Sequence, residues 1–266
     1  MTKLAYKLLI ICCITTIQNL SFSQSGLHSR FQRGIILSSG LNFNKMNTKI
    51  AEGKTGTDLT VGINTIQRLD VNFAFVTGLE FDFSRTNYTF IDSVFYSYTD
   101  SKILLKSDDQ TNSKVFKLNE RNQTPIYLSI PTMLVFRTDY FGYYRYFAKF
   151  GMRHSIALKS TTNDNGVEIE TKEKKELSNM ELSSDLSIYK GSVGIAFGTE
   201  WNYYGTSIMV FELGYYYGIN NIHRSDAMIG DDKDKNRSLF QNLNLTSFTS
   251  LKNTQNQLTF KVSFLF

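Results

Sequence analysis

The sequence predicts an all-β fold, an antiparallel up-and-down transmembrane β-barrel of eight strands. Long segments alternate apolar and polar residues with period two, and tight and long connections alternate between these segments. Period-two alternation is typical of β-strands that have one apolar face. A strand that crosses a membrane needs about 9–11 residues, whereas most strands of soluble proteins have about 5–6. After the N-terminal leader, no apolar run reaches the ~18 residues of a membrane helix.

The first 23 residues have the pattern of a secretory signal peptide and are excluded from the fold, leaving residues 24–266 as one barrel domain. Lys3 and Lys7 form a basic head before an apolar run, and small residues mark a cleavage site before Gln24. Both cysteines lie within this leader, so the mature chain has no disulfide or thiolate ligand. Removing the leader lowers the formal net charge from +5 to +3. The charges are mixed along the chain, so we expect no nucleic-acid partner.

Three strands are expected in the first third of the chain, at about residues 33–44, 59–68 and 72–84. In the third, Phe73 and Phe81 share one face, whereas Glu80 and Asp82 share the other. A tight turn at residues 69–70 joins the second strand to the third.

Residues 85–124 are rich in Ser, Asp, Asn and Lys and are expected to form a long connection. Short β-like pieces lie near residues 103–105 and 115–116. They indicate a hairpin that rises above the membrane, or two further crossings that would give ten strands. Neither piece alternates for long enough to cross a membrane, which favours eight strands.

Five more strands are expected, at about residues 126–137, 146–157, 192–201, 209–219 and 257–266. The connections between them are short, long, tight and long, as in outer-membrane barrels, whose short turns face the periplasm and whose long loops face outward. An even strand number places both termini on the periplasmic side. Aromatic residues near the short turns predict one interfacial girdle. These are Tyr140, Phe141, Tyr143, Tyr144, Tyr146, Trp201, Tyr203 and Tyr204.

Three stretches carry a resemblance to a known family: YLSIPTMLVFR (127–137), YFAKFGM (146–152) and ELGYYYGINNI (212–222). With the closing strand that ends on Phe266, they resemble the Bacteroidota outer-membrane β-barrel family often called PorT-like. The resemblance covers essentially the whole mature chain and implies an eight-stranded barrel, and one branch of the family is tied to a protein-secretion machine. The matching motifs belong to strands and turns, so the secretion role transfers to no residue. One departure is that Arg137 is followed by Thr138 rather than an aromatic residue. Phe266 is expected to be an assembly signal for the outer-membrane assembly machinery.

The polar faces of the predicted strands carry four acidic and four basic residues. Eight strands leave an interior just wide enough for side chains, and unpaired charges there are costly, so we expect mutual neutralisation. Arg153 with Glu200, and Glu212 with Lys261, are the expected neighbours across adjacent strands. We interpret the set as a structural charge network, the alternative being a gated path for protons or small ions. Its members are Glu80, Asp82, Arg137, Lys149, Arg153, Glu200, Glu212 and Lys261.

No pattern in the sequence predicts a catalytic, cofactor or metal site. The acidic stretch at residues 231–236 has Arg237 and Leu243 where a calcium loop requires glycine and glutamate. His28, His154 and His223 are scattered and have no carboxylate motif beside them.

The predicted function is that of a non-enzymatic protein, exported by its signal peptide and held in the lipid of the outer membrane. Its extracellular loops would bind an envelope or surface partner, with an accessory role in protein secretion implied by the PorT-like resemblance. One alternative is a narrow channel or transporter for small solutes. Another is a lipocalin-like barrel that binds lipid, but such a barrel needs an apolar interior, the reverse of the predicted faces.

Overall fold

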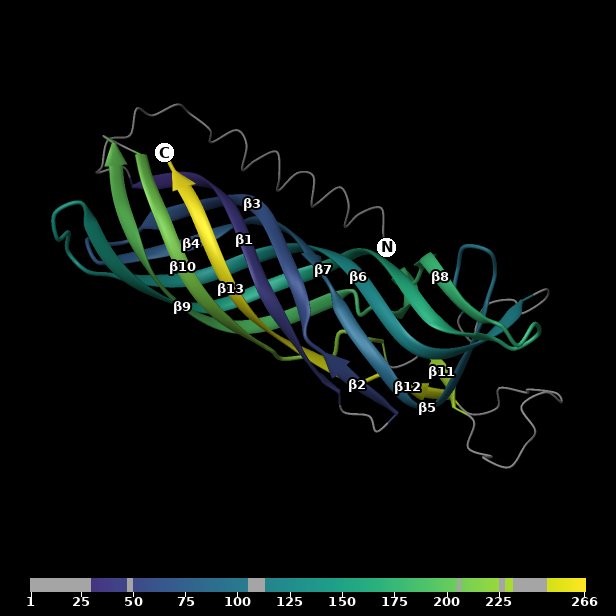
Figure 1. The fold of residues 1–266 in the computed structure, drawn as a ribbon. Helices are drawn as coiled ribbons and strands as arrows, with labels where there is room; N and C mark the ends of the chain where they lie inside the picture. Colours follow the sequence, from purple (N-terminus) through teal and green to yellow (C-terminus); the bar gives the residue numbers. More distant parts are fainter. Residues whose placement is uncertain (1–29, 47–49, 105–112, 205–206, 225–227, 232–247) are drawn as a thin grey trace, which may run out of the picture.

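A computed structural model describes residues 30–46, 50–104, 113–204, 207–224, 228–231 and 248–266. Eight strands form a closed antiparallel ring in which each strand pairs with its predecessor and the last pairs with the first (Figure 1). The ring contains β1 (Phe31–Met46), β3 (Gly56–Arg68), β4 (Phe73–Ser84), β6 (Lys114–Arg137), β7 (Tyr144–Glu168), β9 (Tyr189–Tyr204), β10 (Ser207–Gly218) and β13 (Asn253–Leu265). The predicted eight-stranded up-and-down barrel is confirmed. The leader at residues 1–23 lies outside the described residues.

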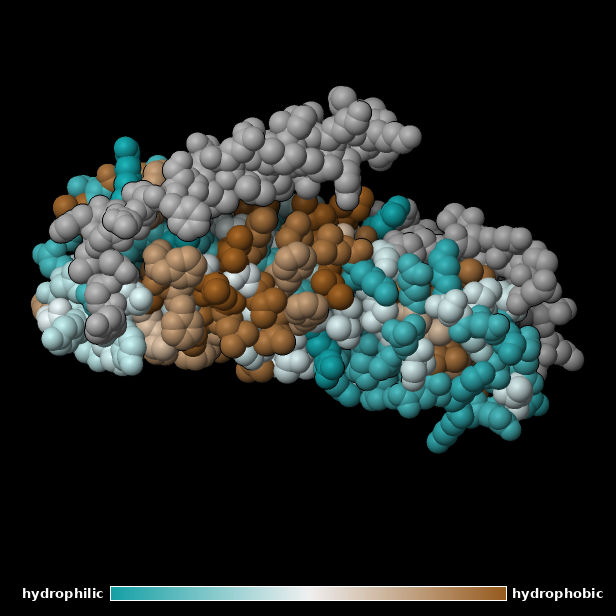
Figure 2. Space-filling model, turned by 90° about the horizontal axis from the view of Figure 1, so that it is seen from above, coloured by the Kyte–Doolittle hydropathy of each residue, from teal (hydrophilic) through white to brown (hydrophobic). Residues whose placement is uncertain are grey.

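Side chains alternate strictly between the two sides of this ring. Phe81, Ile195 and Phe260 point outward and are 44, 51 and 52 % exposed, whereas their sequence neighbours are buried inside. The outward apolar side chains form a belt over the barrel body, and hydrophilic residues dominate the surface beyond it (Figure 2). Such a belt is stable when lipid covers it. Within the described part of the chain, no helix is long and apolar enough to span a membrane.

Aromatic side chains ring the short-turn end, where the β3–β4 and β6–β7 connections and the C-terminus lie. Phe141, Tyr143 and Tyr203 are exposed there, and the rings of Tyr144 and Trp201 stack with centroids 6.0 Å apart. This arrangement fits the predicted interfacial girdle, whose last member, Tyr204, has no described side chain.

The opposite end is built from strands that continue far past the belt. β6 has 24 residues and β7 has 25, more than twice the ~9–11 that a crossing needs. β5 (Thr86–Tyr98) follows β4 after Arg85 and pairs with the upper part of β6, residues 114–123. The ten-strand alternative is therefore wrong, because β5 extends the β4 edge upward instead of crossing a second time.

These continued strands and four short ones form a sheet that we call the outer module. It contains β5, residues 114–125 of β6, residues 159–168 of β7, β2 (Ala51–Lys54), β8 (Lys174–Glu181), β11 (Met228–Asp231) and β12 (Phe248–Ser250). A 3₁₀ turn, η1 (Ser183–Asp185), connects it back to the barrel. In Figure 1, β5, β8, β11 and β12 gather at the end far from the C-terminus.

β6 and β7 are longer than the sequence predicts. The prediction starts the first of these strands at residue 126 and ends the second at residue 157, whereas β6 begins at Lys114 and β7 ends at Glu168. Leu158 and Asn119 are each an extra residue in the β6–β7 ladder, so the alternation changes phase at both points. Such β-bulges break the period-two pattern while the hydrogen-bonded ladder continues. Residues 114–125 and 158–168, for which the sequence predicts connections, therefore belong to strands.

The outer module has an apolar core of its own. Phe116 and Val94 are completely buried, and the ring centroids of Tyr96 and Phe116 lie 5.5 Å apart. This is the reverse of the barrel, since here apolar residues lie inside and polar ones face water. The core consists of Ile50, Ala51, Tyr88, Phe90, Val94, Tyr96, Tyr98, Ile103, Phe116, Leu118, Leu177, Met180, Leu182 and Leu251.

Deleting residues 264–266 should strongly reduce the yield of folded barrel. Phe264 and Leu265 pair with β1 on one side and β10 on the other, and the Phe266 N–H donates to the Arg33 carbonyl at 2.8 Å. Their loss leaves backbone groups unpaired in lipid. The heat-dependent mobility shift of the folded form on SDS gels measures the yield.

The substitution Phe266→Ala separates ring closure from an assembly signal, because it keeps the backbone pairs. We expect it to impair insertion in cells while refolding into detergent stays normal. Normal cellular insertion of the deletion variant would contradict both roles.

Candidate functional site

All eight charged residues singled out in the sequence point into the barrel. None is more than 8 % exposed, although they come from six different strands. They are Glu80 and Asp82 on β4, Arg137 on β6, Lys149 and Arg153 on β7, Glu200 on β9, Glu212 on β10 and Lys261 on β13.

Arg153 organises the centre of the lumen, because its side chain extends from β7 past β6 to β4. Its Nη2 donates to Glu80 Oε2 at 2.6 Å and to Asp82. Lys261 Nζ donates to the other oxygen of Glu80 at 2.7 Å. The Thr60 hydroxyl donates to Asp82 at 2.8 Å, so both carboxylates have several donors, as buried charges require.

Two further sets of ion pairs lie nearer the short-turn end. Lys149 donates to Glu212. Glu200 receives two guanidinium groups, with Arg137 Nε 2.9 Å from Oε1 and Arg145 Nε donating to Oε2 at 2.6 Å.

Both expected pairs lie on adjacent strands and face the same lumen, but their charged groups bond to other residues. In the register of β7 and β9, Arg153 lies opposite Ser192 and Glu200 lies opposite Arg145. Glu212 and Lys261 do lie opposite each other, but each bonds to a different strand. Alternation determines which side chains face the lumen, whereas the stagger of the strands determines which of them lie at the same height.

Three buried charges in the lumen were missed by the sequence reasoning: Asp58, Arg145 and Lys190. Each lies in phase with inward residues that were recognised, since Arg145 precedes Lys149 by four positions and Lys190 precedes Ser192 by two. The signal was present, but the predicted strands began one or two residues too late to include them.

A layer of apolar side chains also fills part of the lumen, which the sequence had predicted to be a polar core. An ideal Cβ added to Gly198 would lie 2.4 Å from Phe147 Cζ, so the Phe147 ring occupies the space above this glycine. Side chains thus fill the lumen at this level, as eight strands allow. The layer contains Ile66, Ala74, Val76, Met133, Val135, Phe147, Ile208, Val210, Tyr216 and Leu265.

A buried hydrogen-bonded chain lies where the lumen meets the outer module. His223 Nδ1 is 2.7 Å from an Asp185 carboxylate oxygen, and His223 Nε2 is 2.9 Å from the Tyr88 hydroxyl. Asn253 donates to the same hydroxyl at 2.8 Å. The sequence has no carboxylate motif beside His223, but the fold brings Asp185 to it from 38 residues away.

The other two histidines and the acidic stretch at residues 231–236 remain to be placed. His154 faces outward and bonds to Tyr189, whereas His28 and the stretch after Asp231 lie outside the described residues. Among the residues with described positions, no three His, Cys, Asp or Glu side chains gather as a metal site would require.

An apolar outer belt, an aromatic girdle and a charge-paired interior define the class as a transmembrane β-barrel. The chain belongs to the family described as outer membrane protein beta-barrel domain, whose model matches residues 19–224. The protein is therefore a protein of the outer membrane. In this class short turns face the periplasm, so the outer module is extracellular.

Several solved structures are similar to the chain at low identity. Neisserial surface protein A is 10 % identical with a TM-score of 0.34, and covers 90 % of this chain and 98 % of its own. Ail, the attachment invasion locus protein of Yersinia pestis, is 11 % identical with a TM-score of 0.34, and covers 90 % and 100 %. The N-terminal β-barrel domain of Pseudomonas aeruginosa OprF is 10 % identical with a TM-score of 0.26, and covers 88 % and 99 %. No curated protein sequence matches the chain.

Removing one member of a lumen ion pair should cost more than removing both. The substitution Lys149→Ala leaves Glu212 buried without its bonded partner, and we expect a loss of about 3–5 kcal/mol in the free energy of unfolding. The double variant Lys149→Met, Glu212→Gln keeps the volume and should lose much less. Urea unfolding in detergent measures this, with Lys159→Ala on the exposed face of β7 as the control. Equal losses in both variants would contradict a paired role.

The Asp185–His223 contact should make stability depend on acid pH. Burial opposes ionisation, but His223 lowers the pKa of Asp185 below its ordinary value. Since the folded pKa is below the unfolded one, the ionised carboxyl stabilises the folded protein above about pH 4. That contribution is lost as the pH falls through the folded pKa. The stability difference between the native protein and Asp185→Asn should therefore shrink on acidification, whereas exposed Asp100→Asn should show no such trend.

Proposed function

We propose that this protein is a non-enzymatic barrel of the outer membrane whose extracellular module binds a protein partner of the envelope or cell surface. The observation that supports the proposal is the outer module itself, a water-facing sheet with its own apolar core. β6 and β7 continue without interruption from the membrane into this sheet. The barrel then acts as a membrane anchor that holds a preformed surface in a fixed orientation.

The edge of the module offers a means of contact. β8 ends the sheet, and apart from the bridge between Lys102 and Glu181 its outer edge pairs with no described strand. An extended segment of a partner can add to such an edge through backbone hydrogen bonds. Exposed Lys174, Lys175 and Glu176 along β8 disfavour indiscriminate pairing and select for a partner of complementary charge.

The packed lumen favours binding over transport. The Phe147 layer and the Arg153 ion pairs occupy the interior at successive heights. The lipocalin-like alternative needs an apolar interior and a polar exterior, and the described barrel has apolar residues outside. The PorT-like resemblance supports an accessory role in protein secretion. The protein would be exported by its signal peptide, and the outer-membrane assembly machinery would recognise its C-terminal strand and insert it.

Site-specific photo-crosslinking in native membranes tests partner binding. We expect a crosslinker placed at Glu176 to capture a discrete protein adduct that survives stringent detergent washing. The same group at Ile195, which is exposed in the lipid-facing belt, is the matched control and should not capture it. Equal capture from both positions, or from neither, would contradict the proposal.

A trimmed barrel provides the complementary variant. Asn87 pairs with Asn122 and Thr162 pairs with Met180, so residues 88–121 and 163–179 can each be replaced by an Asn-Gly turn. Both members of the buried Arg121–Asp164 ion pair leave together, so neither charge is orphaned. The trimmed protein should keep its heat-dependent mobility and lose the partner.

In planar bilayers the native protein should show no steady conductance, because side chains fill its lumen. Ion-selective currents that Glu212→Gln alters would instead establish a channel.

A further inference from the structure

The outer mouth of the lumen is crossed by the hydrogen-bonded chain of Asp185, His223, Tyr88 and Asn253. Tyr88 lies on β5, which continues β4 upward, and His223 follows β10. Three strands separate β4 from β10 in either direction around the ring, so these two side chains come from opposite walls. None of the four residues is more than 5 % exposed. The chain therefore closes the lumen at its outer end.

The backbone that carries this chain has few hydrogen bonds, and we call residues 185–187 and 222–223 the lid. The Ser187 N–H donates to the Ile222 carbonyl at 2.9 Å, and the Ile222 N–H donates to the Asn253 carbonyl at 3.0 Å. Below the lid, β10 pairs with β9 and β13 in long ladders. A segment with few backbone bonds opens locally at a lower free-energy cost than such a ladder. The side-chain bonds of the chain therefore contribute much of what holds the lid closed.

A layer of buried polar side chains, which we call the polar layer, lies directly beneath the lid. Asn253 and Gln255 both donate to Asn44 Oδ1 at 3.3 Å, which connects the chain to this layer. Lys190 Nζ donates to Gln255 Oε1 at 2.9 Å and lies 4.5 Å from the centroid of the Tyr127 ring. The polar layer contains Asn42, Asp58, Ser84, Tyr127, Lys190, Ser192, Gln255 and Gln257.

The hydrogen-bonding capacity of the polar layer is only partly used. Asn42 Oδ1, Tyr127 Oη and Ser192 Oγ are buried and have no hydrogen-bond partner among the described residues. Asp58 and Lys190 form no ion pair in the described part of the chain and bond to neutral side chains instead. Buried polar groups that lack a protein partner are usually satisfied by water. The polar layer is therefore suited to contact with water or with small polar solutes.

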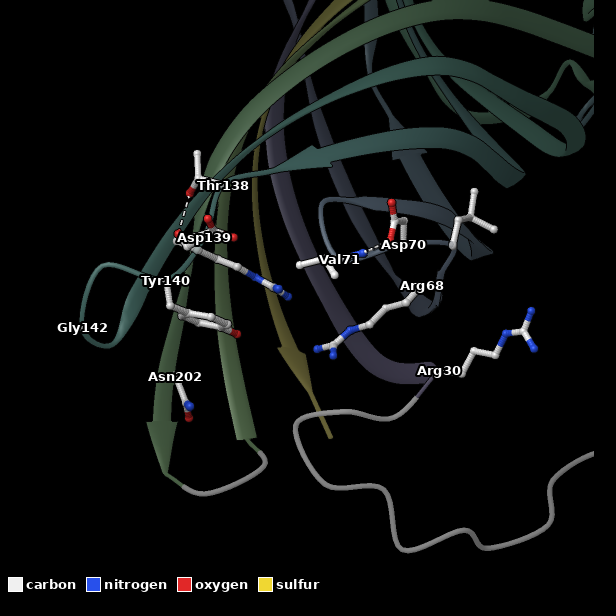
Figure 3. Close-up of a pocket in the computed structure, with 11 residues that line it drawn as sticks. Arg30, Arg68, Asp70, Val71, Thr138, Asp139, Tyr140, Gly142 and Asn202 are labelled. Atoms are coloured by element: carbon white, nitrogen blue, oxygen red, sulfur yellow. Dashed lines mark hydrogen bonds between the residues drawn. The ribbon is translucent and has the colours of Figure 1, made fainter.

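The lumen is blocked below the polar layer. The ion pairs of Arg153 fill the next level, and the apolar layer that contains Phe147 follows. The periplasmic mouth has a separate cavity of about 690 Å³, lined in part by Val71, Tyr140 and Asn202, on the far side of the apolar layer (Figure 3). Opening the lid therefore exposes the polar layer to the outside without creating a path through the membrane.

We propose that the lid is a gate that opens to admit water and small polar solutes from the outside to the polar layer. The bond between His223 and Tyr88 keeps it closed. With Nδ1 of His223 bonded to the Asp185 carboxylate, Nε2 is directed at the Tyr88 hydroxyl. The lid does not include the β8 edge, so this gate is independent of the partner surface proposed above.

Cysteine labelling of the purified barrel in detergent tests the gate, because residues 24–266 contain no cysteine. Ser192→Cys places a thiol in the polar layer, and a small charged methanethiosulfonate measures its accessibility. We expect slow labelling in the native background and labelling about tenfold faster or more when Tyr88→Phe is added. The phenyl ring keeps the volume, but His223 and Asn253 lose their bonds to the hydroxyl.

Three further variants make the test specific for the gate. Tyr127→Phe is the matched control, since it removes a buried hydroxyl that bonds to no described residue, and it should leave the rate unchanged. Asp185→Asn keeps the size of the side chain and should accelerate labelling less than Tyr88→Phe. Ser263→Cys lies opposite Val210 of the apolar layer and should stay unlabelled in every background.

Retained heat-dependent mobility shows that each variant is folded. An unchanged labelling rate at position 192 in both Tyr88→Phe and Asp185→Asn would overturn the proposal. Labelling at position 263 as fast as at position 192 would also overturn it, because it would show a general loosening of the barrel.

Discussion

A lipid bilayer provides no hydrogen-bond partner for backbone N–H and C=O groups, and the whole structure depends on this constraint. Each spanning strand must have a neighbour on both sides, so the sheet has to close. β13 closes it by pairing with β1 on one side and β10 on the other. Once the ring is closed, period-two geometry assigns every residue to lipid or lumen. The outward phenylalanines and inward charges are consequences of the same closure.

Closure with eight strands also explains the character of the interior. The lumen is narrow enough for side chains of non-adjacent strands to touch, so Arg153 on β7 reaches Glu80 and Asp82 on β4 although β6 lies between these strands. Most of the buried charges have a partner of opposite sign, and Lys190 and Asp58 are hydrogen-bonded to Gln255 and Gln257. Glycines make space for large rings in the same way, as Gly198 does for Phe147.

The same strands have different environments at the two ends of the barrel. Beyond the bilayer the lipid no longer selects an apolar exterior, so β6 and β7 bury Phe116 and Leu118 inside and turn polar residues to water. Bulges at Asn119 and Leu158 accommodate this change. At the periplasmic end the strands stop at tight turns, whereas the middle of the barrel is packed with side chains.

The sequence by itself determined the fold class, the number of crossings and the side on which each residue lies, because alternation is a local property of a strand. Glu80, Lys149 and Glu212 were placed inside the barrel for that reason. Arg145 and Lys190 carried the same signal but lay just outside the predicted strand limits. The tertiary structure alone decided which charges bond, since the partners of Arg153 and Glu200 depend on strand stagger, which no single segment encodes. It alone also revealed the module strands and the Asp185–His223 contact, because a bulge interrupts the alternation and 38 residues separate those two side chains.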